Sequence, residues 1–316
     1  MTLPAAAQEY AVATLTPNGS IERTTYGGER PDALYEAGSI GKFACTIAAL
    51  RLVDSGYLML DSSVDSLLPE FANTPIASIT LRQLLASRSG LTDGLLPAFG
   101  ADPARVMATP DAQTATANFA AGPLAFEPGT QWSYDLVNWV VVQAIVERVT
   151  GEPIAQVLNR NVLSPAGMGA SKIFVGRVGD AGAVPVNTSP PLPTFLTCAG
   201  GLAATPLDLI ALLRFAHMGG LSETSLAELM TVHTVEEDYA LGGRFIRWDG
   251  AGETRLMSWQ SGSNGAYKSL AVYDPLSDTG FAAMTAQDDW EEIESAREEW
   301  LAQLNDSDLI DANPAS

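Results

Sequence analysis

The sequence predicts an α+β fold: an antiparallel sheet built from both termini and flanked by helices, with an inserted all-α domain. Two observations support this prediction. Segments that alternate like strands lie near both ends of the chain, within residues 8–26 and 239–285, whereas helical periodicity dominates between them. A further amphipathic helix is expected over residues 291–304. We therefore expect residues 1–60 and 196–316 to form the sheet domain, and residues 61–195 to form the inserted, mainly helical domain.

The N-terminal elements are a hairpin and a buried helix. Residues 8–16 and 21–26 are predicted strands, joined by a turn at Pro17-Asn18-Gly19. Apolar residues over 43–53 then predict a helix that is buried on most sides. Gly56 is the expected C-terminal cap of that helix.

The middle of the chain alternates between helices and long Gly- and Pro-rich stretches. Thr80 is the expected N-cap of a helix over 79–85, and further helices are predicted over 137–149 and 154–163. Residues 91–130 and 176–195 are predicted to be irregular, which is typical of loops that line functional sites.

The last third of the chain changes from helical to strand periodicity. Thr205 and Pro206 predict a helix start, because a threonine N-cap followed by proline at the first helical position is a favourable combination. Four strands are then expected, over 239–248, 254–259, 267–273 and 280–285. These strands would complete the sheet that the N-terminal hairpin begins.

Composition excludes several classes of partner. The 316 residues carry 37 acidic and 17 basic side chains, a net charge of −20, which argues against binding to nucleic acid or to anionic membranes. No run of 18 apolar residues is present, so no transmembrane helix or membrane insertion is predicted. The first seven residues do not resemble a signal peptide. The expected location is cytoplasmic, or periplasmic or secreted if a leader has been removed; the oligomeric state is left open.

The two cysteines, Cys45 and Cys198, are not expected to form a disulfide framework, and Cys45 is expected to pack in the core. No Cys/His pair has zinc-ligand spacing. We therefore predict neither a metal nor a cofactor.

Ser39 and Lys42 are the first candidates for catalysis. They lie three residues apart at a predicted helix start, so both side chains would share one face of the helix. A serine hydroxyl needs a neighbouring base to become a good nucleophile, and a lysine amine can act as that base. A capping serine beside a surface lysine would give the same pattern, so this pair alone does not decide the function.

Several further stretches, in order along residues 8–300, resemble the serine β-lactamase-like hydrolases. This superfamily includes class C β-lactamases, penicillin-binding proteins, D-aminopeptidases and related carboxylesterases. The stretches that carry the resemblance are Tyr35-Glu-Ala-Gly-Ser-Ile-Gly-Lys42, Ile79-Thr-Leu-Arg-Gln-Leu-Leu85 with Ser89-Gly-Leu91, Phe126-Glu-Pro-Gly-Thr-Gln-Trp-Ser-Tyr134, Leu163-Ser-Pro-Ala-Gly-Met168, Ala199-Gly-Gly-Leu-Ala-Ala-Thr205 and Tyr239-Ala-Leu-Gly242.

The resemblance implies a role for each matching residue. Ser39 would attack a carbonyl carbon and form an acyl-enzyme, Lys42 would hold or accept its proton, and Tyr134 would relay a proton to the leaving group. The backbone N–H groups of Ser39 and Ser263 would form the oxyanion hole. The implied substrate-binding residues are Leu136, Asn138, Gln260, Ser261 and Gly262.

Two of these positions depart from the family pattern. Leu136 stands where the family usually has asparagine, and Asn138 is a candidate to replace part of its role. Gln260 stands where a lysine or histidine commonly helps to hold a substrate carboxylate. Three arginines are alternative candidates for that cation, although each is expected to be structural or surface-exposed: Arg88, Arg244 and Arg247.

We therefore predict a serine hydrolase acting on small-molecule substrates, an esterase or amidase rather than an efficient β-lactamase. The alternatives on the same site are an acyltransferase, a weak β-lactamase or a D-peptidase. A non-catalytic binding module on the same fold is the alternative from another class. A Ser-His-Asp hydrolase is disfavoured, because the chain has only His217 and His233 and no Gly-x-Ser-x-Gly elbow. His217 lies near a predicted helix end and is expected to be a C-terminal cap partner or a surface residue.

Overall fold

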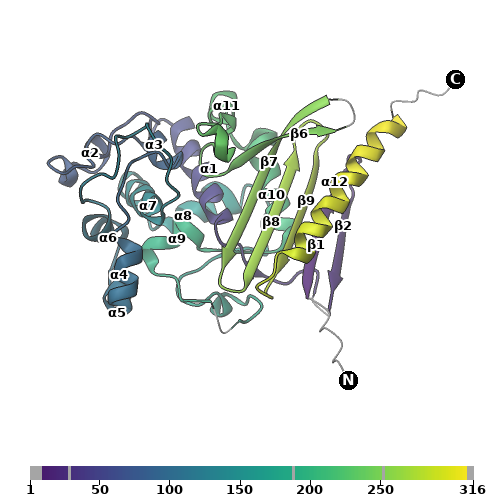
Figure 1. The fold of residues 1–316 in the computed structure, drawn as a ribbon, viewed down its shortest axis with the longest axis horizontal. Coiled ribbons are helices and arrows are strands. Elements are labelled where there is room, and N and C mark those ends of the chain that lie inside the picture. The colour runs from purple at the N-terminus through teal and green to yellow at the C-terminus, as the bar shows by residue number, and fades with distance from the viewer. Residues whose placement is uncertain (1–8, 28–29, 187–188, 251–252, 312–316) are drawn as a thin grey trace.

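A six-stranded antiparallel sheet forms one half of the molecule. The computed structural model describes residues 9–27, 30–186, 189–250 and 253–311, with the last side chains described at residue 305. The strands lie in the order β2-β1-β9-β8-β7-β6 (Figure 1). Their bounds are β1 Tyr10–Leu15, β2 Ile21–Tyr26, β6 Arg244–Gly250, β7 Glu253–Asn264, β8 Tyr267–Asp274 and β9 Thr279–Thr285. The N-terminal hairpin therefore extends a sheet made by the C-terminal strands, as predicted.

Each face of the sheet packs against a helix. In β9, Phe281 and Ala283 belong to a cluster with Ile293 and Trp300 of the C-terminal helix α12 (Glu291–Asp311). The intervening residues of β9 face the main core, where α10 (Pro206–Phe215) contacts β9, β1 and β8. The alternation follows from the period of two along a strand, which sends successive side chains to opposite faces.

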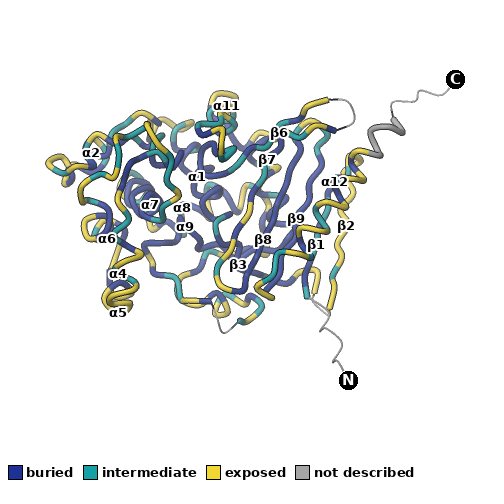
Figure 2. The backbone as a smooth tube through the Cα atoms, in the orientation of Figure 1, coloured by how far each residue is buried: buried dark blue, intermediate teal, exposed yellow. Residues whose placement is uncertain are grey.

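Helices make up the other half of the molecule, around α1 (Ile40–Asp54) and α7 (Leu136–Thr150), which are largely buried (Figure 2). The remaining helices are α2 Val64–Leu67, α3 Leu81–Leu85, α4 Leu95–Ala101, α5 Pro103–Met107, α6 Ala112–Phe119, α8 Ile154–Leu158, α9 Thr197–Gly200 and α11 Glu223–Met230. In the described part of the chain, no helix combines the length and apolar character needed to cross a bilayer.

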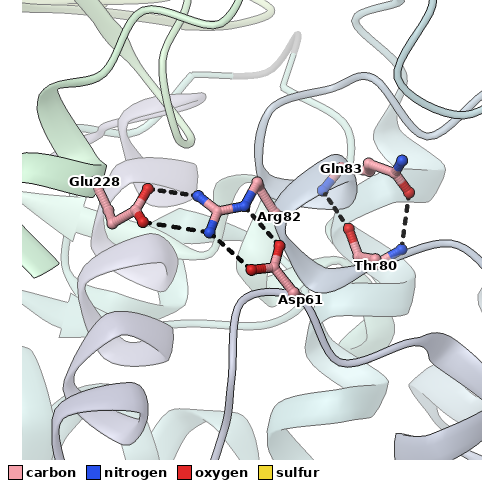
Figure 3. Close-up of polar contacts among 5 residues, drawn as sticks. All are labelled: Asp61, Thr80, Arg82, Gln83 and Glu228. Atoms are coloured by element: carbon pink, nitrogen blue, oxygen red, sulfur yellow. Dashed lines mark hydrogen bonds and ion pairs between the residues drawn. The ribbon is translucent and has the colours of Figure 1, made fainter.

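Local capping signals match the predicted helix starts. Thr80 and Gln83 form a reciprocal capping box at α3 (Figure 3). Within the same helix, Arg82 forms ion pairs with Asp61 and Glu228. Asp61 lies in the segment that follows α1 and Glu228 lies in α11, so Arg82 links these two parts of the chain. Thr205 caps α10 by accepting from the backbone of Asp208 at 3.1 Å.

Three expectations from sequence are wrong. Residues 91–130 contain α4, α5 and α6 rather than only irregular chain; Asp102 and Asp111 cap the last two helices. Cys45 and Cys198, 153 residues apart, form a disulfide between α1 and α9. His217 is buried rather than capping or exposed, because its ring packs between Phe245 and Tyr273.

Candidate active site

Ser39 lies at a tight turn between a short strand and the largely buried helix α1. Strand β3 (Tyr35–Glu36) pairs with β5 (Leu202–Ala204), which pairs in turn with β4 (Lys172–Ile173). Gly38 then turns the chain with φ +52°, and Ser39 is the N-cap residue of α1. The first N–H groups of a helix lack partners within that helix, so this position places Ser39 in a field that favours negative charge.

Lys42 reaches back along α1 to Ser39. Its Nζ lies 3.0 Å from Ser39 Oγ and donates to the carbonyl oxygen of Ala199 at 2.8 Å. The residue is only 2% exposed. At this distance the amine can donate a hydrogen bond to the serine oxygen when charged, or accept the serine proton when neutral.

Tyr134 completes the group of polar side chains at this point. Its ring centroid lies 5.2 Å from Lys42 Nζ, just before α7 begins. Trp132 and the fully buried Tyr239 hold the ring, with centroids 6.0 Å and 5.9 Å away, and Tyr239 meets it edge-on. The phenol is therefore fixed by aromatic packing while 38% of the residue remains exposed.

The end of β7 is pressed against the turn that carries Ser39. A Cβ atom on Gly38 would lie 2.6 Å from the backbone nitrogen of Ser263, and one on Gly262 would lie 1.9 Å from the carbonyl oxygen of Ala37. Ser269 of β8 secures the contact by donating to the Ala37 carbonyl at 2.9 Å. The two backbones can approach this closely only because neither glycine has a side chain.

A cavity of about 440 Å³ opens in front of Ser39. Its walls are mostly apolar and come from α4, the start of α7 and the proline-rich segment before α9. The lining residues are Glu36, Gly38, Ser39, Lys42, Leu96, Phe99, Leu136, Pro190, Pro191, Leu192, Pro193, Leu196, Ala199, Gly200, Ser263 and Asn264. Such a cavity suits a small molecule with an apolar group next to the reacting carbonyl.

Comparisons with known proteins identify the family of this chain. The model of the beta-lactamase family matches residues 6–305. The chain belongs to the beta-lactamase family. Esterase EstB of Burkholderia gladioli is 34% identical over 186 residues, covering 55% of this chain and 47% of that protein. Lovastatin esterase of Penicillium rubens is 29% identical over 235 residues, covering 61% and 58%. The chain thus spans about half the length of these curated relatives.

Solved structures support the α+β fold of this family. A D-stereospecific amidohydrolase from Streptomyces superposes with a TM-score of 0.76 at 22% identity, covering 89% of this chain and 90% of that chain. A penicillin-binding protein from Bacillus halodurans gives a TM-score of 0.76 at 20% identity, covering 92% and 95%. At these identities the likeness concerns the fold alone.

Four of the five predicted substrate-binding residues of this beta-lactamase-family chain do not line the cavity. Asn138 accepts from Ser89 at 2.5 Å and donates to the Asp135 carbonyl at 3.2 Å, so it ties α7 to the neighbouring loop. Gln260 is buried and donates to the Arg244 carbonyl at 3.0 Å. Ser261 and Gly262 contribute to β7 without lining the cavity, whereas Leu136 does line it.

None of the three candidate arginines lines the cavity, and two of them bind backbone carbonyl groups. Arg88 donates to the carbonyls of Gly129 and His233. Arg244 donates to the Glu237 carbonyl at 3.1 Å. Arg247 does not line the cavity either. Among the described lining residues, Lys42 is the only cation. Within the described ranges, no group of three or more His, Cys, Asp or Glu side chains is arranged to hold a metal ion.

Glu36 lines the cavity, although no sequence pattern predicted a role for it. It is 2% exposed, and its carboxylate accepts from Asn264 at 2.6 Å and from Ser189 at 2.9 Å. Burial raises the pKa of Glu36 to about 7, although both hydrogen bonds act in the opposite direction. The available signal was a glutamate within the buried strand that leads to Ser39, where charge is uncommon.

Proposed function

We propose that this beta-lactamase-family hydrolase is a carboxylesterase that acts on neutral esters with an apolar acyl group. The contact that carries the proposal is the 3.0 Å approach of Lys42 Nζ to Ser39 Oγ at the mouth of an apolar cavity. Two of its relatives are named esterases. The lack of a second cation among the described lining residues favours substrates without a carboxylate.

The chemistry divides into two steps. Ser39 Oγ bonds to the ester carbonyl carbon, its proton passes to Lys42, and the carbonyl oxygen becomes an oxyanion stabilised by the N–H groups of Ser39 and Ser263. The bond to the alcohol oxygen then breaks, and Tyr134 relays a proton to that oxygen. Water then bonds to the acyl carbon, the bond between that carbon and Ser39 Oγ breaks, and the acid leaves. One proton of the water replaces the proton that Ser39 lost.

A fluorophosphonate reaction tests the nucleophile. Intact-mass measurement should show one adduct on the wild-type protein and none on Ser39→Ala. Ser55→Ala removes an exposed serine just after α1 and should label like wild type. An adduct that persists in Ser39→Ala, or no adduct on the wild type, would contradict the proposed acyl-enzyme.

A side-by-side assay of p-nitrophenyl butyrate and nitrocefin tests the substrate class. We expect kcat/KM to be at least about 100-fold higher for the ester, because the described cavity lining offers no cation besides Lys42 to hold the β-lactam carboxylate. A higher kcat/KM for nitrocefin would favour a β-lactamase. No turnover of either compound would favour a binding module.

A further inference from the structure

We propose that Glu36 is a positioning residue that joins the Ser39 turn, the end of β7 and the proline-rich cavity wall. The inference rests on the proposed esterase function for its kinetic consequences, but its structural basis is independent of that function. Glu36 lies three residues before Ser39, Asn264 directly follows Ser263, and Ser189 directly precedes Pro190 and Pro191.

The three side chains form a closed set of hydrogen bonds. Asn264 donates to one carboxylate oxygen at 2.6 Å and approaches Ser189 Oγ at 3.2 Å, while Ser189 donates to the other oxygen at 2.9 Å. One buried carboxyl group therefore fixes two segments that lie 228 and 153 residues away in sequence. Both segments line the cavity.

The connection acts on reacting atoms through its neighbours. The Gly38–Ser263 and Ala37–Gly262 contacts leave the turn and β7 almost no space, so a shift of Asn264 would be transmitted to the Ser263 N–H. In the same way, the hydrogen bond from Ser189 to Glu36 fixes the position of Pro190 and Pro191 in the cavity wall. Glu36 need not touch the substrate to influence both binding and rate.

The surroundings contain few charges that could compensate a buried carboxylate. Lys42 shares the cavity but donates to Ser39 and Ala199. Tyr267 of β8 has a pKa raised to about 12, first by burial and second by Glu36. The neighbour on β5 is Ala203. Arg177 and Asp180 line another hollow, which Ser189 and Tyr267 also line.

Because burial raises the pKa of Glu36, the closed arrangement of its hydrogen bonds is favoured at low pH and disfavoured at high pH. Opening that hydrates this carboxyl group returns its pKa toward 4.5, so ionisation favours the open arrangement as pH rises through about 7. Glutamine at this position keeps one acceptor and can donate to Ser189 Oγ, so it preserves the connection without titrating. Glu36→Gln therefore separates hydrogen bonding from charge, whereas Glu36→Ala removes both.

The kinetic test compares kcat/KM for p-nitrophenyl butyrate between pH 5.5 and 8.5. The ratio of Glu36→Gln to wild type should be near 1 at pH 5.5 and rise several-fold by pH 8.5. Glu36→Ala should lose at least about tenfold at every pH, since misplaced catalytic groups are costly. Glu147→Gln is the matched control, because burial also raises the pKa of Glu147, which is half-buried and lies outside the cavity.

Hydrogen exchange measured by mass spectrometry provides a readout that does not need activity. After correction for intrinsic rates, peptides covering Ser189 and Ser263–Asn264 should exchange faster in wild type at pH 8.5 than in Glu36→Gln. If Glu36→Ala does not fold, Ser189→Ala and Asn264→Ala each remove one of the two hydrogen bonds to Glu36, together with the bond between Asn264 and Ser189, and should raise exchange in these same peptides.

Two results would overturn the proposal. One is a ratio of kcat/KM of Glu36→Gln to wild type that does not change with pH, together with equal exchange in the two proteins at pH 8.5. The other is wild-type exchange in Ser189→Ala and Asn264→Ala. A wild-type protein with no Ser39-dependent turnover would refute the proposed function instead. The exchange experiment would still decide the role of Glu36.

Discussion

Gly38 and Ser263 lie so close that a Cβ atom on Gly38 would stand 2.6 Å from the Ser263 backbone nitrogen. The two residues belong to segments that meet only in the folded chain: the turn before α1 and the end of β7. This contact brings the two N–H groups of the proposed oxyanion hole to one cavity. It makes the position of each group depend on the other.

Gly38→Ala should therefore reduce kcat/KM by about 100-fold or more, comparable to the loss of an oxyanion donor. Gly56→Ala is the matched control: Gly56 also has a positive φ, +75°, but a Cβ there would meet nothing within 4 Å. Both variants share the cost of placing an alanine in the left-handed region of backbone conformation, about 1–2 kcal/mol. Equal activities of the two folded variants would contradict the argument.

Lys42→Met should lower kcat by about 10²–10⁴-fold, the range expected when a general base is removed. Methionine has a similar length and carries no charge into this buried position, so α1 should remain folded. Stopped-flow acylation by p-nitrophenyl butyrate measures the affected step. Lys172→Met, at an exposed lysine of β4, should react like wild type; a similar loss there would point to a non-specific effect.

Tyr239→Leu should lower kcat by about threefold to tenfold, because an edge-on aromatic contact is worth about 0.5–1.5 kcal/mol in holding Tyr134. Tyr239→Phe keeps the ring and should retain most of the activity. The deciding measurement is a double-mutant cycle with Tyr134→Phe. If Tyr239 acts through Tyr134, the two losses will not add; strict additivity would indicate separate roles.

Phe99→Ala and Leu136→Ala should shift the preference among p-nitrophenyl esters toward longer acyl chains. Both side chains line the cavity. Each added methylene that becomes buried should gain about 0.8 kcal/mol, or roughly fourfold in kcat/KM. Met107→Ala, on the exposed side of α5, is the control. An unchanged chain-length profile in both cavity variants would show that these residues do not contact the acyl group.

His217→Phe should reduce the dependence of stability on pH between about 4 and 6.5. Burial lowers the pKa of His217 to about 4, against 6.5 when exposed, so the folded state binds fewer protons and stability is lost as pH falls through this window. The contribution is at most about 3 kcal/mol. Urea unfolding at pH 4.5 and 7.5 measures it; the same pH difference in variant and wild type would contradict the prediction.

The sequence was most informative where structure is local. The Thr80 capping box and the Thr205 cap follow from hydrogen bonds spanning three residues, so their sequence signals were sufficient. The helices within residues 91–130 were not predicted, because they are only 7, 5 and 8 residues long and lie among Gly and Pro residues that are typical of irregular chain. No sequence pattern predicted the disulfide between Cys45 and Cys198, because only the packing of α9 on α1 brings the two residues together.

By itself, the sequence determined the serine and lysine on one helical turn, because a spacing of three residues places them together in any α-helix. The α+β class was also predictable from strand patterns at both ends of the chain. Only the tertiary structure decided what surrounds that pair. It brought Asn264 to Glu36 across 228 residues and turned Asn138 and Gln260 away from the cavity. The physical reason is that such contacts depend on the packing of the sheet against α1 and α7, which no local pattern encodes.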